Sequence, residues 1–226
     1  MATTLTVTRD FRARLLRRSR RAGLSLDSTL AGQLVSYCEL LARWNRKINL
    51  TSITQADEAI DRLLLEPLLA ARHLPAGRPL QLLDIGSGGG SPAIPLKLAS
   101  PDTGLTMVES KVRKSAFLRE AVRHLALEST VVETTRYEEL LTRPELHEAI
   151  DVVSLRAVRA ESRVLMGLQA FLKPGGWFFL FTSASGPGPQ TSMPPPLTLL
   201  AIHPLVESLR SRLVVIEKQP VGGRSS

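Results

Sequence analysis

The chain has 226 residues, of which 43% are hydrophobic and 22% charged, so it is long enough for one sizeable core and has the composition of a globular protein. No apolar run approaches the ~20 residues of a membrane span, the single cysteine, Cys38, excludes a disulfide framework, and four scattered histidines give little support for a metal site. The 29 Lys and Arg residues against 21 Asp and Glu give a net charge of +8, which is typical of a protein with a polyanionic partner such as nucleic acid.

The basic excess is concentrated near the start of the chain. The stretch RDFRARLLRRSRRAG, residues 9–23, holds seven arginines and one aspartate. Three interpretations stay open: a solvated and partly disordered tail, an arm that neutralises phosphates, and an organellar transit peptide. We expect residues 1–23 to form a basic N-terminal arm.

Two helices are predicted after this arm. Apolar residues recur at helical spacing in the first of them, at Leu30, Leu34, Tyr37, Cys38, Leu41 and Trp44. That helix runs into a basic, turn-rich stretch, RWNRKINLTSI, residues 43–53. The second is predicted over residues 57–73, with a kink near Pro67. We expect residues 24–75 to form a helical extension.

From residue 76 onward, short apolar runs alternate with helical patterns. About seven strands with crossover helices indicate an α/β fold with a doubly wound, largely parallel sheet. No helix is predicted between the last strands, so we expect one of them to be antiparallel, at the edge. The predicted core covers residues 76–220, with a tail at 221–226. Strands are predicted at 80–85, 104–109, 129–133, 150–155, 177–181, 197–202 and 212–217, and helices at 92–98, 112–127 and 161–172.

A glycine-rich loop follows the first predicted strand. The spacing Asp84-x-Gly86-x-Gly88-x-Gly90 differs from the GxGxxG of a dinucleotide site, and the chain lacks the GxxxxGK(S/T) of a triphosphate site. Glycine lets a ligand approach the backbone, and ligands of open α/β sheets lie beyond the carboxyl ends of the strands. Glu109 ends the next predicted strand, where a carboxylate accepts hydrogen bonds from ribose hydroxyls.

This pattern resembles the S-adenosylmethionine site of class I methyltransferases. The resemblance implies that Asp84 anchors the loop and reaches the methionine amine through water, while the glycines pack against the sulfonium donor. An NAD-dependent oxidoreductase would need a hydride-transfer partner residue, which we do not find in the sequence.

The residues narrow the methyl acceptor by elimination. Methylation at C5 of a pyrimidine needs a nucleophilic cysteine, and Cys38 lies in the N-terminal helix, far from the later loops. Methylation of exocyclic amines commonly uses an (Asp/Asn/Ser)-Pro-Pro-aromatic motif, which VVSLRAV at residues 152–158 lacks. An acceptor atom that already carries a free lone pair, such as guanine N7, needs alignment with the methyl group and no general base to remove a proton. This elimination is compatible with guanine N7 as the methyl acceptor but does not single it out.

Six motifs appear in an order that resembles one family. They are YCELLARWNRKINLTSI, LLDIGSGGGSPAIPLKL, VESKVRKSAFLREAVRHL, RYEEL, VVSLRAV and FLKPGG. Together they resemble the RsmG (GidB) family of bacterial 16S rRNA guanine-N7 methyltransferases, over residues 23–218. The resemblance implies a class I Rossmann-like fold with a small N-terminal helical extension and S-adenosylmethionine as methyl donor. It also implies 16S rRNA or a small-subunit precursor as partner and a bacterial, cytoplasmic setting, which argues against a transit peptide. We expect a monomer that binds neither membrane nor metal.

The motif match also assigns residues. It implies that Gly86 and Ser91 contact the cofactor and that Tyr137 and Glu138 lie on its adenine side. Arg156 is implied at the site, either on the O6/N7 edge of guanine or steadying the cofactor, with a salt bridge as the simpler alternative. Candidate RNA contacts are Arg43, Arg46, Lys47, Lys111, Arg113 and Lys114.

Two other functions stay open from the sequence. The chain departs from the family's usual residues at Leu63, Pro67 and Thr182. A class I methyltransferase with a different acceptor, or an RNA-binding protein with a vestigial cofactor pocket, would also fit these departures.

Overall fold

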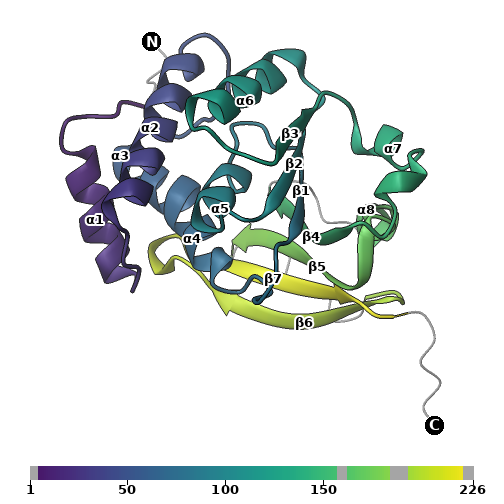
Figure 1. Cartoon of the computed structure of the whole chain (residues 1–226). Coiled ribbons are helices and arrows are strands. Elements are labelled where there is room, and N and C mark those ends of the chain that lie inside the picture. Colours follow the sequence, from purple (N-terminus) through teal and green to yellow (C-terminus); the bar gives the residue numbers. More distant parts are fainter. Residues whose placement is uncertain (1–4, 157–161, 184–192, 221–226) are drawn as a thin grey trace.

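The computed structural model describes residues 5–156, 162–183 and 193–220. It places one seven-stranded sheet between two layers of helices (Figure 1). The strand order is β3-β2-β1-β4-β5-β7-β6. The strands are β1 (Gln81–Ile85), β2 (Gly104–Val108), β3 (Thr130–Glu133), β4 (Ile150–Arg156), β5 (Leu172–Ser183), β6 (Leu197–Pro204) and β7 (Ser211–Lys218). The predicted α/β fold of about seven strands is confirmed, because each predicted strand overlaps one of these.

Neighbouring residues of the central strands face two different cores. Leu82 of β1 belongs to a cluster shared with the helices of the N-terminal half, whereas Leu83 belongs to a second cluster. The first face is covered by α5 (Ala93–Ala99), α6 (Val112–His124) and the N-terminal helices. The second face is covered by α7 (Tyr137–Leu140) and α8 (Ser162–Leu168). Burial on both faces explains why the central strands read as continuous apolar runs.

The reversed strand is not at the edge, which corrects the prediction. β7 runs antiparallel to β5 and to β6 and lies between them, so that β6 is the edge strand. The burial patterns give the reason. Residues 213–216 of β7 are buried on both faces of the sheet, as expected of an interior strand, whereas β6 alternates between exposed and partly buried positions, as expected of an edge strand with one face open to solvent.

The basic stretch near the N-terminus is a packed helix, α1 (Phe11–Arg21). Phe11 and Leu15 are fully buried in the first core cluster, and Arg18 lies 2.5 Å from the buried carboxylate of Asp61. Apolar burial and ion pairing therefore hold residues 11–21 against the protein, where a solvated tail was one of the interpretations left open. The division into arm, extension and core stays a prediction, since one hydrophobic cluster joins all three.

Helices form where two were predicted after the basic stretch. α2 (Ser28–Asn45) begins at Asp27, whose side chain accepts a hydrogen bond from the Leu30 N–H at 2.8 Å. The second predicted helix consists of α3 (Ala56–Ala59), a π-helical turn (Ile60–Leu65) and α4 (Glu66–Ala71). The irregularity expected near Pro67 is thus a widened turn just before the proline. None of the described helices has the length and apolar character that a membrane crossing requires.

Candidate active site

The glycine loop lies between β1 and α5, at the point where the strand order reverses. The Gly86 and Ser87 N–H groups both donate to the Val108 carbonyl, at 2.9 and 3.0 Å, which draws the loop over the end of β2. Gly90 has φ +84°, and a Cβ added there would lie 2.5 Å from the Ile94 side chain. The backbone therefore takes a path that only glycine permits at this position.

Glu109 connects this loop to the start of α6. One carboxylate oxygen accepts from the Gly88 N–H at 3.0 Å, and the other accepts from the Lys111 N–H at 2.7 Å. The residue is buried at the carboxyl end of β2. The structure thus brings Glu109 to the glycine loop, as the spacing predicted, and each carboxylate oxygen keeps a lone pair for a ligand.

Asp84 carries an unusual buried charge. It pairs in register with Ser154 of β4, and the Ser154 hydroxyl donates to its Oδ1 at 2.5 Å. Its Oδ2 is buried and has no hydrogen-bond partner within the described residues. Burial raises the pKa of Asp84, and the hydrogen bond from Ser154 opposes that rise. Buried polar atoms are normally hydrogen-bonded, so this oxygen indicates a missing donor at the site.

Arg156 ends β4, and three contacts hold its guanidinium. Nη2 lies 2.9 Å from a carboxylate oxygen of Glu66, Nη1 donates to the Arg62 carbonyl, and the group lies over the Phe181 ring, 4.8 Å from its centroid. Burial raises the pKa of Glu66, and the guanidinium of Arg156 opposes this rise. In the part of the chain that the structure describes, the Arg156 Nε and Nη2 atoms have no hydrogen-bond partner. The salt bridge considered from the sequence is therefore present as a close contact, and neither of these two nitrogens is committed to a hydrogen bond.

Pro67 leaves carbonyl groups of the preceding helical turn without their usual partners, and Arg156 and Ser91 donate hydrogen bonds to these carbonyls. The Glu66 N–H donates to the Asp61 carbonyl in the π-helical pattern. Next in that pattern, the Arg62 carbonyl would need the N–H of Pro67, which proline lacks. Arg156 donates to this carbonyl instead, and the Ser91 hydroxyl donates to the next one, that of Leu63, at 2.9 Å.

Sequence reasoning missed Glu66 as a site residue and treated Pro67 only as a departure. The available signal was the proline itself, because it leaves helical carbonyls one turn earlier without their usual partner. Ser154 was also missed, and its role follows only from its register opposite Asp84.

A cavity of about 420 Å³ lies between the helical extension and the glycine loop. That volume is within the ~300–1,000 Å³ of small-molecule sites. α2 also supports the loop directly, because the Tyr37 hydroxyl donates to the Gly89 carbonyl. The cavity is lined by Leu41, Leu50, Thr51, Ser52, Ile53, Glu58, Arg62, Leu63, Gly89, Ser91 and Arg156.

The other predicted cofactor residues are not among the residues that line this cavity; these are Asp84, Gly86, Gly88, Gly90, Glu109, Tyr137 and Glu138. Tyr137 and Glu138 are in α7, beyond the carboxyl end of β3, with Tyr137 half-buried and Glu138 exposed. Cys38 is buried in α2, and burial raises the pKa of its thiol, which disfavours a nucleophilic thiolate. Within the described ranges, no group of His, Cys, Asp or Glu residues is arranged to hold a metal ion.

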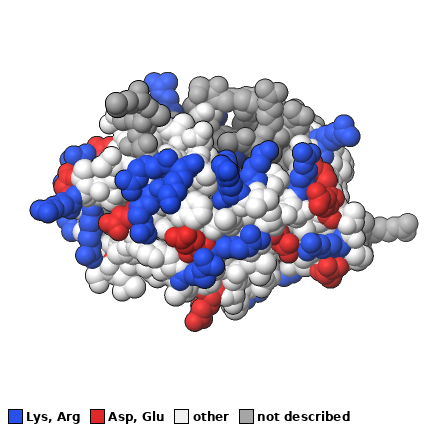
Figure 2. Space-filling model, turned by 90° about the horizontal axis from the view of Figure 1, so that it is seen from above, with Lys and Arg blue, Asp and Glu red and all other residues white. Residues whose placement is uncertain are grey.

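The predicted RNA contacts divide into two groups. Arg43 and Arg46 are exposed near the end of α2 and line neither this cavity nor the next hollow along the surface. Lys47 is brought together with the start of α6, where Lys111, Arg113 and Lys114 line that hollow. Figure 2, which views the molecule from above, shows Lys and Arg side chains gathered across this face.

Comparisons with known proteins give a family match and related sequences. A family model described as "rRNA small subunit methyltransferase G" (GidB) matches residues 31–186. The ribosomal RNA small subunit methyltransferase G of Xanthomonas euvesicatoria pv. vesicatoria (strain 85-10) is 34% identical over 197 residues, which cover 86% of this chain and 90% of that protein. The protein of the same name from Roseiflexus castenholzii (strain DSM 13941 / HLO8) is 41% identical over 144 residues, covering 64% and 61%.

A solved structure shows the same architecture. The SAM-dependent methyltransferase from Aquifex aeolicus aligns with a TM-score of 0.53 at 14% identity, covering 78% of this chain and 97% of that chain. At that identity the likeness concerns the fold alone.

Proposed function

The chain belongs to the rRNA small subunit methyltransferase G (GidB) family, and from this membership we propose that it transfers a methyl group from S-adenosylmethionine to N7 of a guanine in 16S rRNA. The observation that carries the proposal is the buried, unpartnered Oδ2 of Asp84 beside the glycine loop. An anionic acceptor that lacks a donor fits a ligand with an ammonium group, either directly or through water.

The other residues of the loop fit the same ligand. Glu109 accepts hydrogen bonds from ribose hydroxyls, since its carboxylate is fixed by Gly88 and Lys111 but not saturated. Gly86, Gly88 and Gly90 allow close approach of the backbone, Ser91 borders the cavity, and Tyr137 with Glu138 lies on the adenine side. When bound, S-adenosylmethionine supplies an electrophilic methyl group on its sulfonium.

The chemistry asks little of the protein beyond alignment. Guanine N7 carries a free lone pair, so no proton has to be removed and no general base is needed. Arg156, in the cavity wall, is the residue that orients the base: its guanidinium donates to guanine O6, which leaves N7 unblocked. Glu66 and the Arg62 carbonyl hold the guanidinium in place. Glu58, in the cavity wall, offsets the positive charge that develops on the methylated base.

We expect the protein to act as a monomer, and we place its action in the bacterial cytoplasm, where a small-subunit rRNA substrate is found.

Aniline cleavage tests the proposal. Unmodified 16S rRNA and small subunits are each incubated with purified protein and tritiated S-adenosylmethionine, then treated with borohydride and aniline, which break the chain at 7-methylguanine. We expect one new cleavage site, absent without the methyl donor. Tritium in RNA without a cleavage site would indicate a different acceptor atom. RNA binding that ignores the donor, without tritium transfer, would indicate a binding protein with a vestigial pocket.

A further inference from the structure

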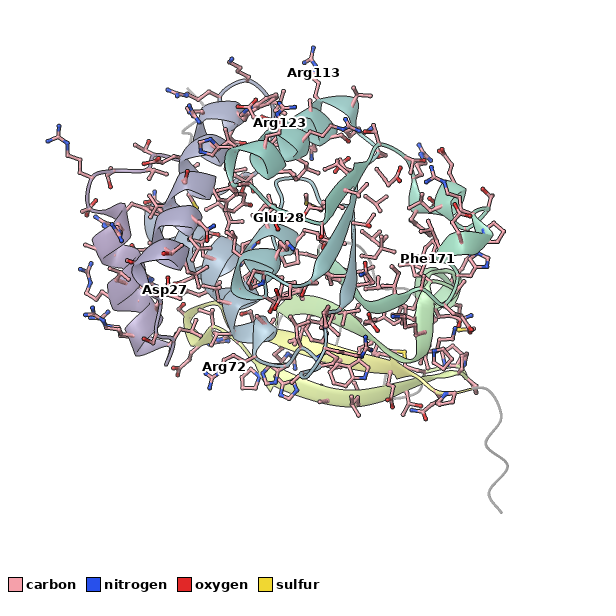
Figure 3. All side chains as sticks on the ribbon, in the orientation of Figure 1. Asp27, Arg72, Arg113, Arg123, Glu128 and Phe171 are labelled. Carbon is pink, nitrogen blue, oxygen red and sulfur yellow. The ribbon has the colours of Figure 1, made fainter. Side chains whose placement is uncertain are left out.

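A second hollow, of about 410 Å³, lies on the surface next to the cavity at Arg156. Residues 47–49, which follow α2, form one wall, and the start of α6 forms the other. Four of the six residues that line it are cationic: Lys47, Lys111, Arg113 and Lys114. We call this hollow the basic groove. Figure 3 shows Arg113, in the first turn of α6, pointing away from the protein.

The cations of the basic groove have no ion-pair partners in the described part of the chain. Within the described residues, the charged side-chain group of none of the four has a carboxylate oxygen within 4.0 Å. In α1 the situation differs, because Arg14 and Arg18 are paired with aspartates. Four unpaired cations around one hollow repel each other, and an external polyanion removes that cost.

The basic groove and the reaction cavity share one segment of chain. Residues 47–49 line the groove, and residues 50–53 line the cavity. The Asn45 side chain fixes this segment, because its Oδ1 accepts from the Leu50 and Thr51 N–H groups at 2.8 and 2.9 Å, and its Nδ2 donates to the Thr51 carbonyl at 3.0 Å. A chain-like ligand in the groove is therefore led along a rigid wall to the cavity.

The opposite wall is equally fixed to the site. The Lys111 N–H donates to Glu109, whose other oxygen holds Gly88 of the glycine loop. Val112, which lies between Lys111 and Arg113 in the sequence, is 71% exposed. Its side chain offers an apolar contact to an RNA sugar or base, whereas an inorganic anion has no apolar surface to make this contact.

From these observations we infer that the basic groove binds the phosphate backbone of a single-stranded RNA segment whose guanine enters the cavity beside Arg156. This inference rests on the proposed function. We infer a single-stranded segment because the acceptor atom is N7. In a double-stranded RNA helix of the A form, N7 faces the deep and narrow major groove, where side chains do not reach it. The target guanine is therefore unpaired, and the strand beside it is the one that meets the groove.

Binding at a series of KCl concentrations tests the groove. Unmodified 16S rRNA is the probe, and Lys47→Ala, Arg113→Ala and the double variant are compared with the wild type. Removing one cation that neutralises a phosphate is expected to lower the slope of log affinity against log salt by about 0.7, and the double variant should lower it by about 1.4. The matched control is Arg72→Ala, since Arg72 is also exposed but lies at the opposite side of the molecule, near α4 (Figure 3).

Methylation kinetics separate this inference from the proposed function. In the double variant we expect the KM for RNA to rise several-fold, while kcat and the affinity for S-adenosylmethionine by calorimetry stay at wild-type values. A wild type that methylates RNA, with groove variants that keep its slope and KM, would overturn the groove alone. A slope that falls equally in Arg72→Ala would also overturn it, by showing diffuse attraction. A wild type that neither binds nor methylates 16S rRNA would overturn both.

Discussion

Replacing Asp84 by asparagine should raise the stability of the ligand-free protein and lower its affinity for S-adenosylmethionine. The side chain is 1% exposed, with one hydrogen bond, from Ser154, and one unpartnered oxygen. A buried charge with incomplete compensation costs several kcal/mol, whereas an unpaired buried amide N–H costs about 1–3 kcal/mol. We expect the free energy of unfolding to rise by about 1–2 kcal/mol in Asp84→Asn, and the melting temperature by about 2–4 °C for each of these kcal/mol.

The pH dependence follows from the direction of the pKa shift. The folded-state pKa of Asp84 lies above its ordinary value of 3.8. Its contribution to stability is therefore fully present below that value and is lost as the pH rises through the folded pKa. The advantage of Asp84→Asn over the wild type should be smallest in acid and grow as the pH rises through this window.

Asp151 provides the matched control on the neighbouring strand. It is buried like Asp84, but Arg78 lies 2.6 Å away and Lys173 3.0 Å away. Burial alone would raise the pKa of its carboxyl, but hydrogen bonds from Arg78, the Gln81 N–H and Lys173 hold this pKa below its ordinary value. Asp151→Asn should lower the free energy of unfolding by about 1 kcal/mol, since its partners are partly exposed.

Chemical unfolding of both variants and calorimetry with S-adenosylmethionine measure these effects. Loss of a hydrogen bond to a charged group predicts about tenfold weaker binding for Asp84→Asn. The reasoning would be refuted by an Asp84→Asn protein that is less stable than the wild type and binds S-adenosylmethionine unchanged. Asp84 would then be a structural anchor and not a ligand for the cofactor.

Three further substitutions probe the site. Glu109→Ala should weaken S-adenosylmethionine binding at least about tenfold in calorimetry, with the fold intact by circular dichroism, because a charged hydrogen-bond acceptor is removed; unchanged affinity would remove its ribose role. Glu66→Ala leaves the charge of Arg156 buried and unpaired, so urea unfolding should show a loss of about 3–5 kcal/mol, and Glu66→Gln a smaller loss; wild-type stability in both would contradict a buried ion pair. Gly90→Ala should lower the melting temperature, since φ is +84° and the new Cβ meets a side chain at 2.5 Å, whereas Gly32→Ala in α2, with open space around it, should raise it slightly.

Local patterns in the sequence were enough to identify the strands and the cofactor loop. Apolar runs of strand length predicted β1 to β7 because the sheet is covered on both faces. Asp84, the glycines and Glu109 followed from spacing within one strand–loop–helix–strand unit, where few residues separate the parts. The motif order identified the family, which the comparisons confirmed.

Contacts between distant parts of the chain were decided only by tertiary structure. The register of β1 on β4 places Ser154 opposite Asp84, and the packing of the π-helical turn on β4 gives Arg156 its partner Glu66. The insertion of β7 between β5 and β6 depends on which strand can satisfy two neighbours. The tertiary structure likewise brings Lys47 next to the start of α6. Spacing along the sequence indicates which residues are neighbours within one turn or strand. These contacts, in contrast, join segments that are far apart in the sequence and come together only when the whole core packs.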